Sequence, residues 1–293
     1  MISVKENAYA KINLYLDVLS KRDDGFHEVK TVMHTVSLCD EVTVSVVSSD
    51  RPMVKLSVLG HPKLPTDSRN LAYRAAELFL EATLIRAEVH VKLVKRIPVA
   101  AGLAGGSTDA AAVLRALNRA FRRPVTEKRL LALAAELGSD VPYCLLGGTA
   151  LCYGRGERIE RLPEKLKLDV VVAVSDEHVS TPWAYAELDR VYSDFKGERD
   201  DDSESKYQTV IKSAEVGSSK EMQLFNVFEN AIFPTYNRAE MLKETMFELG
   251  ASHALMSGSG PSVYGVFSDK ASAESARDAL VKLGIKAYAT TTV

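Results

Sequence analysis

The stretch PVAAGLAGGSTDAA, residues 98–111, has the most specific chemical pattern in this sequence. Three glycines, Gly102, Gly105 and Gly106, stand directly before an alanine-rich segment. Because glycine inside a regular element costs up to about 1 kcal/mol relative to alanine, such a cluster indicates a backbone requirement. Free amides at a helix N-terminus attract anions, and glycines let a phosphate approach the main chain closely. The stretch therefore predicts a phosphate-binding loop followed by a helix.

The residues after the glycines support this helix. Ser107, Thr108 and Asp109 are of the types that cap helix N-termini, so we expect the helix to begin at them. The apolar residues that follow recur at helical spacing: Ala110, Ala111, Val113, Leu114, Leu117 and Phe121.

Two common phosphate loops do not fit this stretch. The loop G-x-x-x-x-G-K-S/T requires a lysine beside its last glycine, and the dinucleotide fingerprint G-x-G-x-x-G has a different spacing. A tight turn that lets a helix pack close to a strand is the alternative. The free amides of a helix start favour phosphate binding over that alternative.

Length and composition exclude several classes of protein. A chain of 293 residues corresponds to about two domains, and 46% hydrophobic with 26% charged residues is ordinary for a globular protein. A net charge of -2 gives no electrostatic attraction to nucleic acid or to acidic membranes. The sequence has no apolar run of about 18 residues and no apolar signal core near residue 1. We therefore predict a cytoplasmic protein without nucleic-acid or membrane partners.

Cysteine and histidine give no sign of a metal centre. The three cysteines, Cys39, Cys144 and Cys152, are odd in number and lack C-x-x-C spacing, which argues against disulfides and structural zinc. The six histidines do not pair at the spacing of metal ligands. We expect no histidine-bound metal.

The elements before and after the glycine loop follow from periodicity. Alternation predicts strands over residues 8–18, 40–47, 54–60 and 87–94. In the first of these, Lys11 and Asn13 project together from the face that we expect to be exposed to solvent. Helices are predicted over residues 68–82 and 126–138, and Ser139-Asp140-Val141-Pro142 resembles a further helix start.

The second half predicts a compact α+β arrangement. Residues 144–162 form two strands around a glycine turn, 168–175 a buried strand, and Ser180-Thr181-Pro182 begins a helix. Residues 196–221 are polar and charge-dense, so we expect an exposed, mobile connection. After it we predict helices over 222–232 and 238–249, with Asn237 and Glu240 in a capping box, then strand 253–256, turn 257–262, strand 263–267, helix 271–283 and strand 286–292.

Three stretches resemble the signatures of the GHMP kinases, which phosphorylate small alcohols. They are AYAKINLYLDVLSKRDDGFHEV (8–29), PVAAGLAGGSTDAA (98–111) and SGSGPSVYGVF (257–267). The AKINL segment, the DGFHE turn and LGSDVPYCLLGGTALCYGRGE (137–157) resemble the members that act on a methylerythritol linked to cytidine diphosphate. The likeness covers nearly the whole chain and is weakest over 196–221.

The resemblance implies a fold and a reaction. The fold is α+β, with a ribosomal-protein-S5-domain-2-like N-terminal domain over residues 1–160 and a ferredoxin-like C-terminal domain over 161–293. The reaction is ATP-dependent phosphorylation of the 2-hydroxyl of the cytidylylated methylerythritol, in the non-mevalonate route to isoprenoids. The enzyme would be a monomer or a homodimer. Mg²⁺ is expected with ATP, and Asp109 is a weak candidate for its ligand.

The resemblance also implies residues that bind ATP. Asn70 and Lys95 match positions that line the adenine pocket, although Asn70 has an equally good role as the cap of a helix over 71–82. Ser107 would offer its hydroxyl to phosphate or magnesium. Ala100, Ala101 and Ala104 stand where relatives have glycine, and we expect little harm from a methyl group. The matching loop is Pro98, Val99, Ala100, Ala101, Gly102, Leu103, Ala104, Gly105, Gly106, Ser107 and Thr108.

Lys11 and Asp140 match the catalytic pair of the family. Phosphoryl transfer to an alcohol needs a carboxylate near the hydroxyl and positive charge near the γ-phosphoryl oxygens. A carboxylate beside an ammonium is a weak base, but in a loose transition state the alcohol loses its proton late. Asp140 would orient the hydroxyl and accept the proton at the end. An exposed lysine and an ordinary helix cap are the alternatives.

Recognition of the cytidine is implied for a second group of residues. Phe26 and Tyr185 match the two stacking positions, and His27 would contact the base. Asn13 and Thr181 would contact the diphosphate or the erythritol. The alternatives are core packing for Tyr185 and a solvated turn for His27, while the single tryptophan, Trp183, is more consistent with packing. The turn over 257–262 is either a hairpin linker or a set of amides that faces substrate phosphate.

Other functions remain open at this point. A homoserine or mevalonate kinase would share the glycine loop, but would leave the DGFHE turn and Tyr185 without an evident role. A non-catalytic nucleotide-binding module would not need Lys11 and Asp140 together. A nicotinamide oxidoreductase is disfavoured because its fingerprint is missing.

Overall fold

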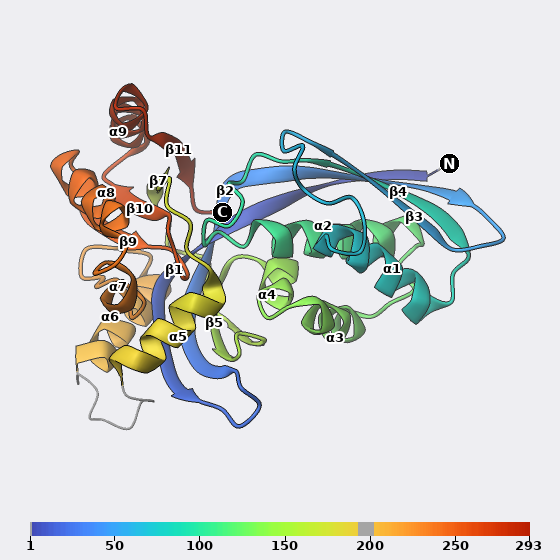
Figure 1. Cartoon of the computed structure of the whole chain (residues 1–293), viewed down its shortest axis with the longest axis horizontal. Helices are drawn as coiled ribbons and strands as arrows, with labels where there is room; N and C mark the ends of the chain where they lie inside the picture. The colour runs from blue at the N-terminus through green and yellow to red at the C-terminus, as the bar shows by residue number, and fades with distance from the viewer. Residues whose placement is uncertain (1, 193–201) are drawn as a thin grey trace. The chain divides into compact units, whose positions relative to one another are not determined.

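A computed structural model of the chain describes residues 2–192 and 202–293, which form eleven strands and nine helices (Figure 1). Contacts divide the chain into two compact units. Unit 1 contains Met1–Ala10, Cys39–Val99 and Ala104–Gly147, and unit 2 contains Lys11–Leu38, Ala100–Leu103 and Gly148–Val293. Two long strands, β1 (Ile2–Lys21) and β2 (His27–Ser48), contribute residues to both units.

Unit 1 is a sheet with helices on one side. The later part of β2 pairs antiparallel with β4 (Ala87–Val94), from Glu41↔Val94 to Ser48↔Ala87, and β3 (Met53–Leu59) pairs parallel with β4. All four helices of this unit lie on the same side of these strands in Figure 1. They are α1 (Leu71–Thr83), α2 (Gly105–Ala120), α3 (Glu127–Leu137) and α4 (Val141–Leu146).

The predicted alternation explains the core of unit 1. Val42, Val44 and Val46 on β2 are buried together with Val89 and Val91 on β4, because successive side chains of a strand point to opposite faces. Helix α2 lies beneath this sheet in Figure 1, and five of its eleven buried residues are alanines. Small side chains let the helix approach the sheet closely, which explains the alanine-rich composition after the glycines.

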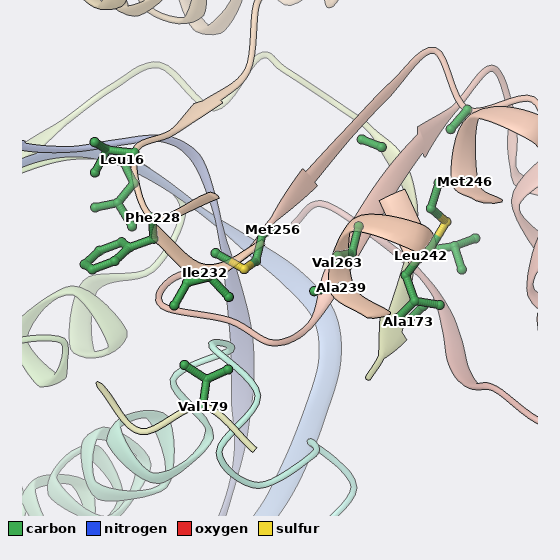
Figure 2. Packing of buried hydrophobic residues seen from close by; sticks show 14 of the residues in the cluster. Leu16, Ala173, Val179, Phe228, Ile232, Ala239, Leu242, Met246, Met256 and Val263 are labelled. Carbon is green, nitrogen blue, oxygen red and sulfur yellow. The ribbon is translucent and has the colours of Figure 1, made fainter. Parts of the chain in front are cut away.

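Unit 2 contains a four-stranded antiparallel sheet in the order β11-β7-β10-β9. Helices α8 (Asn237–Glu248) and α9 (Lys270–Lys282) pack on it, and their buried residues join one hydrophobic cluster with those of the strands (Figure 2). Figure 2 labels Leu242 and Met246 of α8 beside residues of the sheet such as Ala173 and Val263. The strands are β7 (Asp169–Val174), β9 (His253–Met256), β10 (Val263–Phe267) and β11 (Lys286–Thr291).

The rest of unit 2 is built on the first part of β2 and the later part of β1. β5 pairs antiparallel with β2 and with β6, and β8 pairs parallel with β1 through Tyr15↔Phe225 and Leu16↔Asn226. The remaining elements are β5 (Thr149–Gly154), β6 (Arg158–Arg161), β8 (Phe225–Asn226), α5 (Thr181–Val191), α6 (Asp202–Val216) and α7 (Glu229–Ile232). The predicted strands are thus confirmed, with β1 and β2 longer than expected. One bound was wrong: the pair predicted over 144–162 begins only at Thr149, because α4 extends to Leu146.

Two predictions about the segment after α5 were wrong. Within 196–221, residues 202–216 form helix α6 rather than an exposed connection, while 196–201 lie outside the described residues. Val210 and Ala214 of α6 are buried, so a few apolar contacts suffice to dock a helix that is otherwise polar. The predicted helix over 222–232 is limited to α7, because Phe225 and Asn226 are paired with β1.

Two predicted helix starts are also corrected. α2 begins at Gly105 after Ala104, which has a φ of 57° and makes no side-chain cap, so Ser107, Thr108 and Asp109 lie inside the helix. α8 begins at Asn237 without a side-chain cap, so the predicted capping box does not form. The domain boundary near residue 160 stays a prediction, and the compact units follow a different division because β1 and β2 run through both.

Burial fixes the protonation of one histidine in unit 2. His34 is 1% exposed; its Nδ1 lies 2.7 Å from Thr149 Oγ1, and its Nε2 lies 3.1 Å from the carbonyl oxygen of Leu166. Because the carbonyl can only accept, Nε2 carries the hydrogen and Nδ1 accepts from the threonine hydroxyl in the neutral ring. Burial lowers the pKa of His34 from 6.5 to about 4.

The lowered pKa of His34 predicts that the folded protein loses stability in acid. Its pKa in the folded state is below that of the unfolded state, so between pH 6.5 and 4 the unfolded chain binds more protons. We expect the free energy of unfolding to fall by about 2 kcal/mol from this group between pH 7 and pH 5. Urea unfolding of His34→Gln should lack this component, whereas the exposed His90→Gln should keep it. An unchanged pH slope in His34→Gln would contradict the prediction.

Two alanines of the glycine loop predict a gain in stability. Ala100 and Ala104 have φ values of 54° and 57°, a left-handed conformation that a methyl group disfavours by about 1 kcal/mol or more. The expectation that alanine causes little harm is therefore revised. Ala100→Gly and Ala104→Gly should each raise the free energy of unfolding by about 0.5 kcal/mol, since strain relief exceeds the entropy of the added glycine. Ala101→Gly should lower the free energy of unfolding, because Ala101 lies outside the left-handed region. Urea titrations measure all three variants, and a change of the same sign in all three would contradict the prediction.

Candidate active site

The carbonyl oxygen of Gly102 is the meeting point of three chain segments in unit 2. It accepts hydrogen bonds from Lys11 Nζ at 2.8 Å and from Ser257 Oγ at 3.0 Å. The backbone amide of Lys11 donates to Leu103 O at 3.2 Å. A Cβ at Gly102 would lie 1.9 Å from Ser257 O, and the residue has a φ of +72°. Only glycine allows this close approach.

Asn13 completes this junction. Its Oδ1 accepts from Lys11 Nζ at 2.7 Å and from the amide of Gly258 at 3.0 Å, while its Nδ2 donates to Thr31 Oγ1 at 2.8 Å. Tyr264 OH donates to the carbonyl of Asn13. Lys11 and Asn13 do project together, as predicted, but they are 4% and 3% exposed rather than on a wet face. The late glycine turn is therefore bonded to this group and is more than a hairpin linker.

The start of α2 in unit 1 is an accessible helix N-terminus. Gly106 is exposed and Ser107 is half-buried, so backbone amides of the first turn lie near the surface. These amides have no partner within the helix. Thr108 differs, because its buried hydroxyl donates to Tyr9 O at 2.7 Å. The geometry fits anion binding by main-chain amides and by Ser107 rather than by Thr108.

Asp140 precedes α4 without capping it. Its backbone is helical, its side chain makes no cap hydrogen bond, and its carbonyl accepts from Cys144 N at 3.0 Å. The alternative of an ordinary helix cap is therefore not observed, which leaves the carboxylate available for another role. Lys11 belongs to unit 2 and Asp140 to unit 1, so their pairing stays a prediction.

Arg115 holds the helix that follows Asp140. From α2, its Nη1 donates to the carbonyl of Cys144 at 2.8 Å, and its Nη2 donates to Asn7 O at 3.1 Å. Its Nε is 3.4 Å from Glu6 Oε2. One guanidinium thus ties β1 and α2 to the C-terminal carbonyls of α4. Its role could not be predicted from the sequence, because α2 contains a second arginine, Arg119, and no local pattern distinguishes the two.

The predicted adenine residues have other partners in the structure. Asn70 Oδ1 accepts from Ala72 N at 3.0 Å, so the capping role is confirmed, and its Nδ2 donates to Pro65 O at 2.9 Å. Lys95 Nζ is 2.5 Å from Asp40 Oδ2 and 2.8 Å from Asp109 Oδ2, with all three side chains at most 4% exposed. Their contacts to adenine stay predictions. Asp40 gave no signal in the sequence, because its partners lie far along the chain.

The predicted cytidine residues gather in unit 2. The rings of His27 and Tyr185 stack with centroids 4.7 Å apart, and Tyr185 meets Phe228 edge to face at 4.9 Å. His27 is 8% exposed, so the alternative of a solvated turn residue is wrong. Phe26, in contrast, is 51% exposed, and the guanidinium of Arg155 lies 4.9 Å above its ring.

Asp189 organises the histidine of this group. His27 Nε2 is 2.7 Å from Asp189 Oδ1, and Lys21 Nζ is 2.6 Å from Asp189 Oδ2. Burial opposes ionisation of Asp189, but hydrogen bonds from Lys21 and His27 outweigh it and lower the pKa of the carboxyl. Asp189 follows Tyr185 by four residues on α5, a spacing that places both on one helix face and could have identified it.

Two further residues of α5, Thr181 and Trp183, have partners in unit 2. Thr181 Oγ1 lies 3.1 Å from Ser259 Oγ of the 257–262 turn. Trp183 packs against the hydrophobic cluster and meets Tyr236 edge to face, so the prediction of packing is confirmed.

None of the helices within residues 2–192 and 202–293 has the length and apolar character that a membrane span requires.

The fold is shared with known kinases. Residues 70–148 match the family model of the GHMP kinases N terminal domain, and residues 214–286 match that of the GHMP kinases C terminal. A crystal structure of 4-(cytidine 5'-diphospho)-2C-methyl-D-erythritol kinase has a TM-score of 0.82 at 34% identity, covering 99% of both chains. Homoserine kinase from Cytophaga hutchinsonii, with a TM-score of 0.72 at 18% identity over 99% of this chain and 94% of that one, is similar in fold alone.

Curated relatives match nearly the full length. A protein of Caldicellulosiruptor saccharolyticus named 4-diphosphocytidyl-2-C-methyl-D-erythritol kinase is 42% identical over 97% of this chain and 95% of its own length. A protein of the same name from Macrococcus caseolyticus is 42% identical over 94% of this chain and 95% of its own. The predicted two-domain α+β kinase fold is confirmed, and the chain belongs to the GHMP kinase family.

Proposed function

We propose that this kinase transfers the γ-phosphoryl group of ATP to the 2-hydroxyl of 4-diphosphocytidyl-2-C-methyl-D-erythritol, in the non-mevalonate route to isoprenoids. The observation that carries the proposal is the 42% identity, over 97% of the chain, to a relative that is named for this substrate. The aromatic residues around the DGFHE turn support it, because a homoserine or mevalonate group would not use them.

The loop over 98–108 would bind the triphosphate through main-chain amides. Gly106 and Ser107 at the start of α2 are accessible, and the aligned peptides of the helix add positive potential there. Ser107 would donate its hydroxyl to a phosphate oxygen. Pro98 is buried and Val99 is 43% exposed, so the first part of the loop would cover the nucleotide by van der Waals contact.

Lys11 would stabilise the charge that moves with the phosphoryl group. Its ammonium is buried and is oriented by hydrogen bonds to Gly102 O and Asn13 Oδ1. A preorganised charge of this kind needs no reorganisation in the transition state. Asp140 would orient the substrate hydroxyl and take its proton late, a contribution of about 10²- to 10⁴-fold.

The base would stack on the outer faces of the aromatic group. A centroid distance of 4.7 Å leaves no space for a ring between His27 and Tyr185. Phe26 is the exposed ring of the group, so it is the natural lid for a cytosine. Asn13 and Thr181, which are bonded to the 257–259 turn, would face the diphosphate or the erythritol.

Mg²⁺ would arrive with ATP. Asp109 does not fit as its ligand, because the carboxyl is buried and already pairs with the ammonium of Lys95. In the described part of the chain, no group of three or more His, Cys, Asp or Glu residues could hold a metal ion. Mg²⁺ is often held by one or two carboxylates together with substrate phosphates.

A substrate comparison tests the proposed function. ADP release should be fast with the cytidylylated methylerythritol and at least about 10³-fold slower, as kcat/KM, with homoserine or mevalonate. Tyr185→Ala should raise KM for the cytidylylated substrate about tenfold, on the scale of about 1–3 kcal/mol for a stacked base, and leave KM for ATP unchanged. Trp183→Ala on the same helix is the control for packing. Equal turnover of homoserine, or equal effects of Tyr185→Ala on both KM values, would contradict the assignment.

Asp140→Asn tests the proposed base. The amide has the same shape but accepts no proton, so kcat should fall at least about 100-fold while the affinity for ADP stays within about threefold. Coupled ADP-release kinetics and calorimetry measure the two quantities. Asp278→Asn, an exposed aspartate of α9, is the matched control and should be unaffected. A variant that keeps most of its turnover would remove Asp140 from the mechanism.

A further inference from the structure

Unit 1 contains a buried cluster of two carboxyl groups and one ammonium, formed by Asp40, Lys95 and Asp109. Lys95 Nζ lies 2.5 Å from Asp40 Oδ2 and 2.8 Å from Asp109 Oδ2. The side chains are 0%, 4% and 3% exposed in the same order along the chain. Ionic groups are rarely buried this deeply without a structural or functional reason.

The cluster is anchored in the sheet through Asp40. The other carboxylate oxygen of Asp40 accepts from the amides of Arg96 and Ile97 at 2.5 and 2.8 Å. The amide of Lys95 donates to Leu59 O on β3 at 2.9 Å. These bonds join β2, β3 and the turn after β4 around the backbone of Lys95. The position from which its side chain extends is therefore fixed.

The ammonium also supports the first turn of α2. A Cβ at Gly105 would lie 3.3 Å from Lys95 Nζ and 3.1 Å from Ile97 Cγ2, so the first residue of the helix rests on these two side chains. Asp109 follows Gly105 by four residues, one turn further along the same helix, and is held by the same ammonium. Two successive turns at the N-terminus of α2 are thus fixed by one side chain.

We propose that Lys95 is a positioning residue for nucleotide binding, which fixes the N-terminal amides of α2 by gripping Asp109 from the sheet. This inference rests on the proposed function, in which those amides bind the triphosphate. Lys95 then acts through the helix, because its ammonium is already engaged by two carboxyl groups away from solvent. An accurately placed set of amides binds an anion more tightly than a mobile one, since no ordering is needed on binding.

The charge of the cluster agrees with this role. Burial raises the pKa of Asp109 well above its usual range, Lys95 opposes the rise, and the negative charge of Asp40 adds to it. Asp109 Oδ1 is buried and lacks a hydrogen-bond partner among the described residues, which disfavours an ionised carboxyl further. With Asp109 neutral, the charges of Lys95 and Asp40 balance. The cluster then supports the helix without adding negative charge beneath a polyanionic ligand.

A pair of variants that differ only at Lys95 tests the proposal. Asp109→Asn keeps an oxygen that accepts from Lys95, so ADP affinity measured by calorimetry should stay within about threefold of the wild type. In the double variant K95M/D109N the grip on α2 is lost and Asp40 keeps only its hydrogen bonds from the amides of Arg96 and Ile97. Its ADP affinity should fall at least about tenfold and KM for ATP should rise in parallel, while KM for the alcohol substrate stays within about twofold. Lys55→Met, at an exposed lysine that pairs with Glu88 on the same sheet, is the matched control.

A second variant keeps the test decisive if the double variant does not fold. Gly105→Ala adds a methyl group against Lys95 and Ile97 and should shift the helix start, so ADP affinity should fall at least about fivefold with a small change in Tm. Normal ADP affinity in a folded K95M/D109N or Gly105→Ala would overturn the proposal, as would an equal loss in Asp109→Asn alone. Failure of the wild type to bind ADP would instead overturn the proposed function.

Discussion

The contact between Gly102 and the 257–258 turn is the constraint on which one half of the candidate site depends. A single carbonyl oxygen accepts from the ammonium of Lys11 and the hydroxyl of Ser257, and the backbone comes so close that a methyl group has no space. Segments that are far apart in the sequence are held at hydrogen-bond distance by this one peptide. Each of the three stretches that resemble kinase signatures therefore contributes residues to one polar junction in unit 2.

The two buried lysines illustrate two ways of using a charge. Lys11 donates to a carbonyl oxygen and to an amide oxygen, which hold its ammonium in a fixed orientation at the junction. Lys95 pairs with two carboxyl groups, one on the sheet and one on α2, so its charge links the helix to the sheet. Both residues were assigned to the site from the same resemblance, yet their surroundings suit them to different tasks. Resemblance identifies a position, while the neighbouring atoms determine what the side chain does there.

The aromatic residues proposed to bind the cytosine also differ in their surroundings. Tyr185 packs against the hydrophobic core and against His27, whereas Phe26 remains exposed beside Arg155. Asp189 holds the ring of His27 from the next turn of α5. A rigid aromatic floor and one exposed ring suit a planar ligand, because stacking then orders few groups on binding. The core packing of Tyr185 and a role in recognition are compatible, since its side chain is only partly buried.

Local patterns in the sequence determined most of the elements and the glycine loop. Alternation gives strands β3 and β4 nearly residue for residue, and glycine requirements at Gly102 and Gly105 can be inferred because backbone preferences act within a few residues. The three signature stretches likewise point to the family from sequence alone. The start of α2 was misplaced, because Ala104 takes a left-handed conformation that its own preference disfavours.

Only the tertiary structure decided which polar residues are buried and with what partner. Asp40 pairs with a lysine 55 residues away, and Lys11 with a carbonyl 91 residues away, separations that no local pattern records. Helix α6 forms on a polar sequence because a few residues find a docking surface. The physical reason is common to all three cases: burial of a charge, or of a weakly apolar helix, is stable only once distant segments supply the partner that replaces water.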